Sequence, residues 1–190
     1  MNPEFDKAQG AFNALLATNT PPDLDGGPRP GVTPLKTLAL DVDKFTHSFP
    51  LDENVAPLLK CAAFLWHDHH DAAHDLCQDN HSLEGSFLHA LVHRREPDYW
   101  NAKYWFRKVE MHPVFIPLAQ DAVQTIRTSK LDTLTNQVVP GGIWDAFGFV
   151  DAVEQAAAKA FKDPTTPVLR EIQRLEFDHL TGHLLRLGLK

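Results

Sequence analysis

Apolar residues at the spacing of an α-helix recur along most of this 190-residue chain, and prolines and glycines separate one such stretch from the next. A period of three to four residues buries one face of a helix, whereas a half-buried strand alternates every second residue. Strand-like runs are confined to 37–40 and 137–139, and both are too short to build a sheet. We therefore predict an all-α fold.

Breakers and capping residues set the boundaries of these helices. Asn54, Ser82 and Asp98 are suited to cap the helices that follow them, and Pro97 ends the helix before it. Residues 67–71 either continue the preceding helix or form a tight turn. The expected helices are 5–17, 55–66, 70–78, 83–96, 99–111, 114–128, 143–161 and 167–187, with loops at 19–34 (extended) and 45–53.

The length fits one domain, and we expect residues 1–190 to form a compact helical unit with two central α-hairpins and a C-terminal helical pair. The formal net charge is −7, which argues against a nucleic-acid partner because phosphate contacts need a basic surface. The acidic start lacks the features of a signal peptide, and no stretch is apolar enough to span a membrane. We therefore expect a cytoplasmic protein in which Cys61 and Cys77 stay reduced in the core.

Two central segments repeat a pattern. In 68–76 and 98–106, an aspartate precedes a small alanine by four residues, and a large apolar residue follows four residues later. This pattern resembles tetratricopeptide and Sel1-like repeats, in which alanines let paired helices approach closely. The resemblance implies helical hairpins and a surface that binds a protein or peptide.

A second resemblance rests on longer segments. Residues 93–98 read His-Arg-Arg-Glu-Pro-Asp, and residues 101–106 read Asn-Ala-Lys-Tyr-Trp-Phe. Together with 66–74 and the Trp144-Asp145 pair, these segments look similar to an uncharacterised bacterial protein family. The resemblance implies one intact domain and carries no assigned reaction.

Histidine is crowded into one part of the chain, since seven of the eleven histidines lie between positions 67 and 93. His70 and His74 are four residues apart, as are His89 and His93, so each pair shares one face of its helix. Consecutive helices usually pack antiparallel, which would bring the two faces together with Asp71 and Glu96 beside them. The candidate metal ligands are His70, His74, His89 and His93, and the candidate acid–base residues are Asp71, His74, His89, His93 and Glu96.

Imidazoles with nearby carboxylates suit a divalent ion such as Zn, Fe, Mn or Ni. They also suit metal-free acid–base chemistry, because histidine titrates near neutral pH. Two plainer interpretations stay open: either the histidines are solvated on polar helix faces, or they are buried and satisfied by Asp71 or a backbone carbonyl. His179 and His183 form a third pair, with Glu176 one turn before them, on a helix whose amphipathic pattern needs no site.

Four further residues are candidates for holding a ligand. Arg94 or Arg95 could grip a carboxylate or phosphate, or could instead complement the end of a helix and pair with Glu96 and Asp98. Among the aromatic residues that follow, Trp105 and Phe106 are expected in the core. Trp100 and Tyr104 are left to line a pocket or partner surface. The candidate ligand-binding residues are Trp66, Arg94, Arg95 and Tyr104.

Two functions follow from these patterns. The first is a histidine-rich site between two helices that binds a divalent metal or a small anionic ligand, with or without catalysis. The second is a non-catalytic, tetratricopeptide-like module that binds a protein or peptide. The two differ in whether His74 and His89 meet in space.

Overall fold

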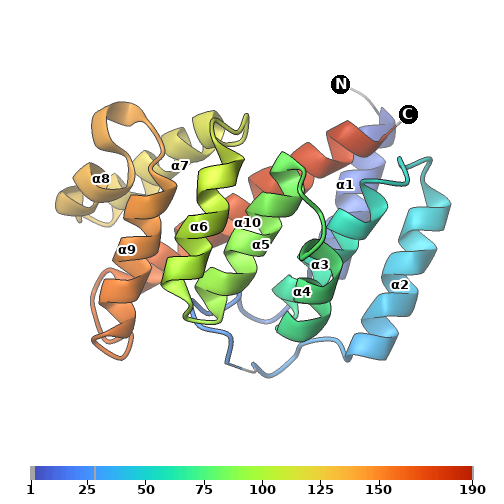
Figure 1. The fold of residues 1–190 in the computed structure, drawn as a ribbon, viewed down its shortest axis with the longest axis horizontal. Helices are drawn as coiled ribbons and strands as arrows, with labels where there is room; N and C mark the ends of the chain where they lie inside the picture. The colour runs from blue at the N-terminus through green and yellow to red at the C-terminus, as the bar shows by residue number, and fades with distance from the viewer. Residues whose placement is uncertain (1–2, 28, 190) are drawn as a thin grey trace.

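The computed structural model describes residues 3–27 and 29–189. Within these ranges the chain forms ten α-helices, one short 3₁₀ turn and no strand (Figure 1). The helices are α1 (Pro3–Leu15), α2 (Leu35–Ser48), α3 (Ala56–Trp66), α4 (His70–Cys77), α5 (Leu83–Arg95), α6 (Tyr99–Val109), α7 (Phe115–Thr128), α8 (Asp132–Val138), α9 (Ala146–Ala157) and α10 (Thr166–Gly188), with η1 (Pro140–Gly142) between α8 and α9. The predicted all-α fold is confirmed.

Helix α10 forms the back of the structure. In Figure 1 it runs behind α5 and α6, and it packs against α1, α3, α7 and α9. In front of it, α3 pairs with α4 and α5 pairs with α6. Helix α5 is therefore enclosed by other helices, and even its polar residues His89, His93, Arg94 and Arg95 are buried. A helix buried all round is where polar side chains must find partners inside the protein.

Several predicted boundaries are confirmed. The Ser82 side chain accepts a hydrogen bond from the Gly85 N–H at the start of α5, and Asp98 accepts one from Asn101 at the start of α6. Residues 67–69 form a turn rather than a continuous helix, with Asp68 at φ 63°. Both cysteines are free and buried.

Other boundary predictions are wrong. The strand-like run 37–40 and the start of the loop predicted at 45–53 belong to α2, because Leu38, Val42 and Phe45 form a helical stripe that packs into the core. Asn54 does not cap α3, which begins after Val55 with no side-chain cap. Helix α8 was not expected. It buries only Leu134 and Val138, too few apolar positions for a clear period.

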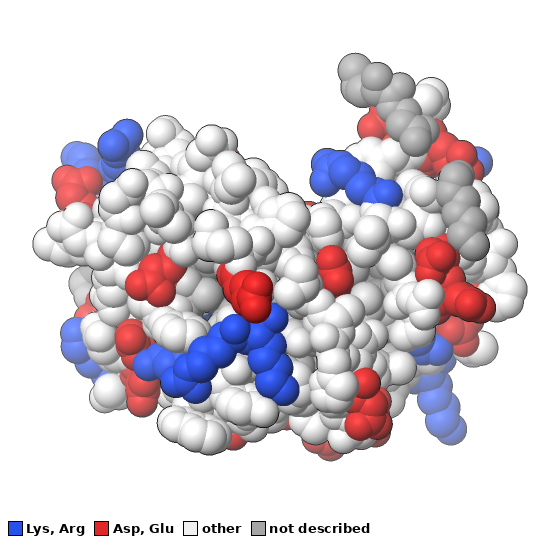
Figure 2. Space-filling model, turned by 45° about the horizontal axis from the view of Figure 1, so that its top comes forward, with Lys and Arg blue, Asp and Glu red and all other residues white. Residues whose placement is uncertain are grey.

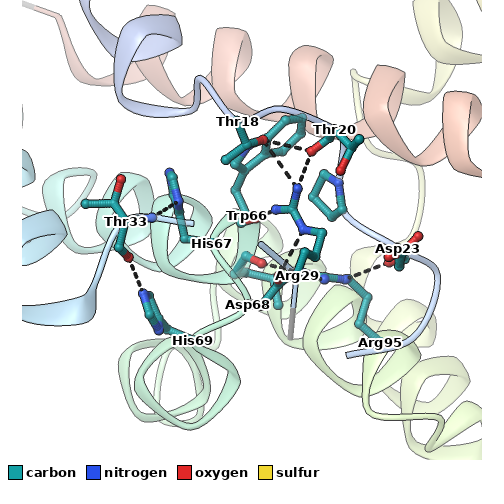
Figure 3. A network of polar contacts seen from close by, with 12 residues as sticks. Thr18, Thr20, Asp23, Arg29, Thr33, Trp66, His67, Asp68, His69 and Arg95 are labelled. Carbon is teal, nitrogen blue, oxygen red and sulfur yellow. Dashed lines mark hydrogen bonds and ion pairs between the residues drawn. The ribbon is translucent and has the colours of Figure 1, made fainter. Parts of the chain in front are cut away.

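The predicted loop 19–34 is extended as expected, Pro28 lying outside the described residues, and a buried polar network holds it against α3 and α5 (Figure 3). Arg29 donates to Asp68 at 2.9 Å and also to the carbonyl oxygen of Trp66. Arg95 donates to the other oxygen of Asp68 at 2.6 Å and to the carbonyl oxygen of Asp23 at 3.2 Å. One carboxylate between two guanidiniums thus joins the loop to the turn before α4.

The surface charge lies in small groups. On the face shown in Figure 2, one band of Lys and Arg side chains lies next to acidic side chains, smaller charged groups lie toward the edges, and broad areas between them carry neither sign. No helix among the described residues has the length and apolar content needed to cross a membrane.

Candidate functional site

Three imidazoles meet between α4 and α5. His74 comes from α4, and His89 and His93 come from α5; one ring nitrogen from each lies within 4.8 Å of the other two. The Nε2 atoms of His74 and His89 are 3.0 Å apart. We call His74, His89 and His93 the three-histidine cluster. The predicted meeting of the two helical faces is confirmed.

The other predicted ligand, His70, lies outside this cluster. Its Nε2 faces the loop, since a Cβ built on Gly26 would lie 2.7 Å from it and 2.8 Å from the carbonyl oxygen of Arg95. Both ring nitrogens are buried, and neither has a hydrogen-bond partner among the described residues. Burial, and then the charge of Arg95, lower the pKa of His70 to about 4. His70 and the exposed Asp71 line a neighbouring cavity of about 300 Å³.

Glu96 and Asn101 hold the ring of His93 from both sides. The Nδ1 of His93 lies 3.2 Å from Glu96 Oε2, and its Nε2 lies 3.1 Å from Asn101 Nδ2. Because a carboxylate can only accept, the Nδ1–H of His93 donates to Glu96, and Nε2 keeps its lone pair. The same hydrogen bond lowers the pKa of Glu96. A carboxylate that fixes a histidine tautomer in this way is the usual outer partner of a metal ligand.

His89 is packed between rings. It stacks on Trp105 at 3.9 Å between ring centroids and on His93 at 4.6 Å. Burial, and then the neighbouring His93 and His74, lower the pKa of His89 to about 3. His89 is therefore neutral near pH 7, and a neutral imidazole is the form that binds a metal ion.

The spacing of these nitrogens suits a metal ion. Zinc binds imidazole nitrogen at about 2.0–2.1 Å, so two nitrogens on a tetrahedral ion are roughly 3.3 Å apart. The 3.0 Å between His74 and His89 is close to that separation. Two imidazoles that face one another through Nε2 can share one proton, or give it up to an ion between them. The three-histidine cluster could hold a metal ion.

A second cluster, which the sequence analysis did not identify, contains Glu84, His112 and His183. One ligand atom from each lies within 4.8 Å of the others. The Nε2 of His183 is 3.1 Å from Glu84 Oε1, and the Nε2 of His112 is 3.8 Å from the same oxygen. These two imidazoles, His112 first, hold the pKa of Glu84 well below its ordinary value. We call this group the Glu84 cluster.

The Glu84 cluster has a different proton arrangement. The Val114 backbone N–H donates to Nδ1 of His112 at 3.2 Å, so the lone pair of Nδ1 is already in use. Neutral His112 must then carry its proton on Nε2, which faces Glu84. A metal at Nε2 would require this proton to move and the Val114 hydrogen bond to break. The Glu84 cluster is therefore arranged to direct an imidazole N–H toward an ionised carboxylate.

The two arginines are fully buried and paired. Arg94 binds Glu176 at 2.5 Å and lies 4.6 Å from the centre of the Phe149 ring, and Arg95 binds Asp68. The expected pairing with Glu96 and Asp98 is wrong, because α5 is enclosed and its arginines face α10 and the loop instead. Burial raises the pKa of Glu176, against the effect of Arg94. These pairings hold the fold together at the positions where a ligand was expected.

The aromatic candidates divide as predicted. Trp105 and Phe106 are buried, whereas Trp100 is 73% exposed and Tyr104 is 40% exposed. Trp66 is buried, and its Nε1 donates to Thr18 Oγ1 at 3.1 Å (Figure 3). Trp66 thus contributes to packing of the loop.

The sequence analysis missed two residues that contact the three-histidine cluster, Asn101 and Trp105. Asn101 lies two turns beyond His93 in sequence and on the next helix, so only the α5–α6 turn brings it back to His93. Trp105 was expected in the core but not against a histidine. For the Glu84 cluster, residues 84, 112 and 183 are far apart in sequence, and no local spacing relates them.

Comparison of the chain with protein-family models, with curated proteins and with solved structures found no match. The fold and the site therefore rest on the geometry itself. The geometry defines an all-helical protein with a histidine cluster that could hold a metal ion.

Proposed function

We propose that this protein binds one divalent transition-metal ion through His74, His89 and His93. The observation that carries the proposal is the convergence of three imidazole nitrogens within 4.8 Å of one another. Imidazole is a borderline ligand that suits Zn, Fe or Ni more than Mg or Ca. Zinc is the first ion to test, since it accepts a tetrahedral site of this size.

The surroundings of the cluster support the same proposal. Glu96 fixes the tautomer of His93, and the low pKa of His89 keeps that ring uncharged at neutral pH. Three protein ligands leave one position of a tetrahedral ion open, as in catalytic rather than structural zinc sites. That position would take water or an anionic ligand such as a carboxylate or phosphate. Because Arg94 and Arg95 are buried, such an anion would be held by the ion itself.

The test is metal binding by protein prepared without a polyhistidine tag. Chelator-treated wild type and the variants His74→Ala, His89→Ala and His183→Ala are equilibrated with Zn²⁺, and bound metal is measured after gel filtration. We expect one ion per chain in the wild type and in His183→Ala, and none retained in His74→Ala or His89→Ala. His183 is the matched control because it is a partly buried histidine of the Glu84 cluster.

Two results contradict the proposal. One is a wild-type protein that retains no Zn²⁺, Fe²⁺, Ni²⁺ or Mn²⁺ at concentrations in the micromolar range. The other is an ion that His183→Ala loses and His89→Ala keeps. Circular dichroism of each variant separates loss of the site from loss of the fold.

A further inference from the structure

A groove separate from both histidine clusters lies between the end of α6, the start of α7 and the segment that leads into α9. Its larger part is a cavity of about 470 Å³, a size typical of small-molecule sites. A smaller cavity of about 150 Å³ adjoins it, since Met111, Phe115, Ile143 and Trp144 line both. The groove therefore continues from α6 along α7.

Exposed apolar side chains border this groove. Met111 is 76% exposed, Ile116 is 67% exposed and Ile143 is 62% exposed, and all three line one or both cavities. In Figure 2 the upper left of the molecule, where Figure 1 places α7, includes a broad area without charged side chains. Clustered apolar side chains that a protein leaves exposed mark binding sites.

Two hydrogen-bond donors in the larger cavity are available. The Trp144 side chain is 5% exposed, and its Nε1 has no hydrogen-bond partner among the described residues. A buried donor without a partner costs about 1–3 kcal/mol, which a ligand acceptor would recover. The guanidinium of Arg107 lies 5.7 Å from the centre of the Phe147 ring and forms no ion pair with a described carboxylate.

The two acidic residues of the lining do not cancel these donors. Asp145 Oδ1 accepts hydrogen bonds from the backbone N–H groups of Phe147 and Gly148, so it is used to begin α9. Glu110 is exposed at the end of α6, with φ 51° and ψ −128°. Such backbone outliers in residues other than glycine occur preferentially at ligand sites. The groove thus offers a buried donor at Trp144 and an exposed cation at Arg107, while Glu110 faces solvent.

We propose that this groove binds an amphipathic carboxylic acid, a medium-chain fatty acid in the simplest case. The apolar chain lies along Ile143, Trp144 and Ile116, and the carboxylate pairs with Arg107. The Trp144 indole N–H provides a second donor toward the head of the ligand. This site is independent of the metal site, since it uses none of the three histidines.

The experiment is titration of the full-length protein with decanoate below its micelle concentration, and with 1-decanol as the uncharged probe. The indole N–H signals of the four tryptophans are followed by ¹H–¹⁵N NMR, with Trp144→Phe to assign the signal of Trp144. We expect saturable decanoate binding that shifts the Trp144 signal and leaves that of Trp66 in place.

Three variants sharpen the test. Ile143→Asp is expected to weaken binding of both probes about tenfold or more, because it places a carboxylate in the apolar wall. Arg107→Gln is expected to weaken decanoate about threefold, as fits an exposed ion pair, and to leave 1-decanol unchanged. Leu40→Asp changes an exposed apolar residue of α2, 61% exposed, and should have no effect on either probe.

The proposal is overturned if decanoate shows no saturable binding, or if Ile143→Asp binds it as the wild type does. Equal loss in Leu40→Asp would show nonspecific adsorption and would also overturn it. If Arg107→Gln binds decanoate as tightly as the wild type does, the assignment of a carboxylate ligand is wrong.

Discussion

The two histidine clusters both include residues of α5, and each joins three ligand-type groups, but their imidazole protons sit in different places. In the three-histidine cluster, the Nδ1–H of His93 donates to Glu96, and its Nε2 carries no proton. In the Glu84 cluster, the Val114 N–H occupies Nδ1 of His112 and keeps the proton on Nε2. The first cluster leaves the Nε2 of His93 without a proton, whereas the second directs an imidazole N–H toward a carboxylate.

The comparison shows that the number of histidines does not by itself define a metal site. Which nitrogen carries the proton is set by the group that contacts the other nitrogen. A carboxylate acceptor favours metal binding at the opposite nitrogen, and a backbone N–H donor opposes it. We therefore expect metal at the first cluster and an ionised carboxylate paired with imidazole N–H groups at the second.

The largest expected effect is the loss of metal-dependent stability. Zinc at about 100 times its dissociation constant should stabilise the wild type by about 2.7 kcal/mol. His74→Ala should lose this increment, while His183→Ala should keep it because the ion does not touch the Glu84 cluster. Urea unfolding with and without Zn²⁺ measures both. An increment that survives in His74→Ala would place the ion elsewhere.

The next effect comes from the two carboxylates. Glu96→Gln should weaken Zn²⁺ binding about 10- to 100-fold, the usual cost of removing an outer partner of a metal-bound histidine. Glu84→Gln is the matched control and should leave the affinity unchanged. Competition with a chromogenic chelator gives both dissociation constants. Equal affinities in Glu96→Gln and wild type would show that His93 is not oriented by Glu96.

Stability at acid pH should depend on the Glu84 cluster rather than on the three-histidine cluster. The folded-state pKa of Glu84 is lowered from its ordinary value of 4.5, so its stabilisation is complete above about pH 4.5. It is lost as the pH falls toward the lowered value, because the unfolded chain takes up a proton first.

Metal-free Glu84→Gln should therefore be less stable than wild type at pH 6, with a gap that narrows by about 1 kcal/mol on acidification to pH 3.5. Urea unfolding at the two pH values measures the gap. A gap in stability that is constant with pH would contradict the lowered pKa of Glu84.

The smallest expected effect is at Asn101. In the metal-free state its amide lies on the Nε2 of His93, where the ion is proposed to bind. Asn101→Ala removes that competing hydrogen bond, worth about 0.5–1.5 kcal/mol, and should tighten Zn²⁺ binding a few-fold. Isothermal titration measures the change. Weaker binding in Asn101→Ala would mean that the amide supports the bound ion.

Sequence reasoning found the helical architecture because most helices carry a clear apolar period, and a few also begin at a capping residue, as α5 does at Ser82. It also found His74, His89 and His93. His89 and His93 are four residues apart on α5, and a hairpin of α4 and α5 brings His74 to the same face. It failed for α2, where the short run 37–40 resembles a strand until Val42 and Phe45 complete the stripe.

The remaining parts of the sites depend on contacts that sequence spacing does not encode. His70 shares the helical face of His74, but its ring lies against the loop at Gly26 and outside the cluster. Arg94 and Arg95 were candidates for an anionic ligand, yet Glu176 and Asp68 from distant segments bind them. The tautomer of His112 follows from one backbone N–H, which only the folded chain positions.

The most direct test of the account is imidazole ¹⁵N NMR during a Zn²⁺ titration of tag-free, metal-free protein. One ring nitrogen each of His74, His89 and His93 should shift to the metal-bound range, complete at one equivalent. The nitrogens of His112 and His183 should stay where they were. Metal-bound shifts at His112 or His183, or no response from any histidine, would contradict the central claim.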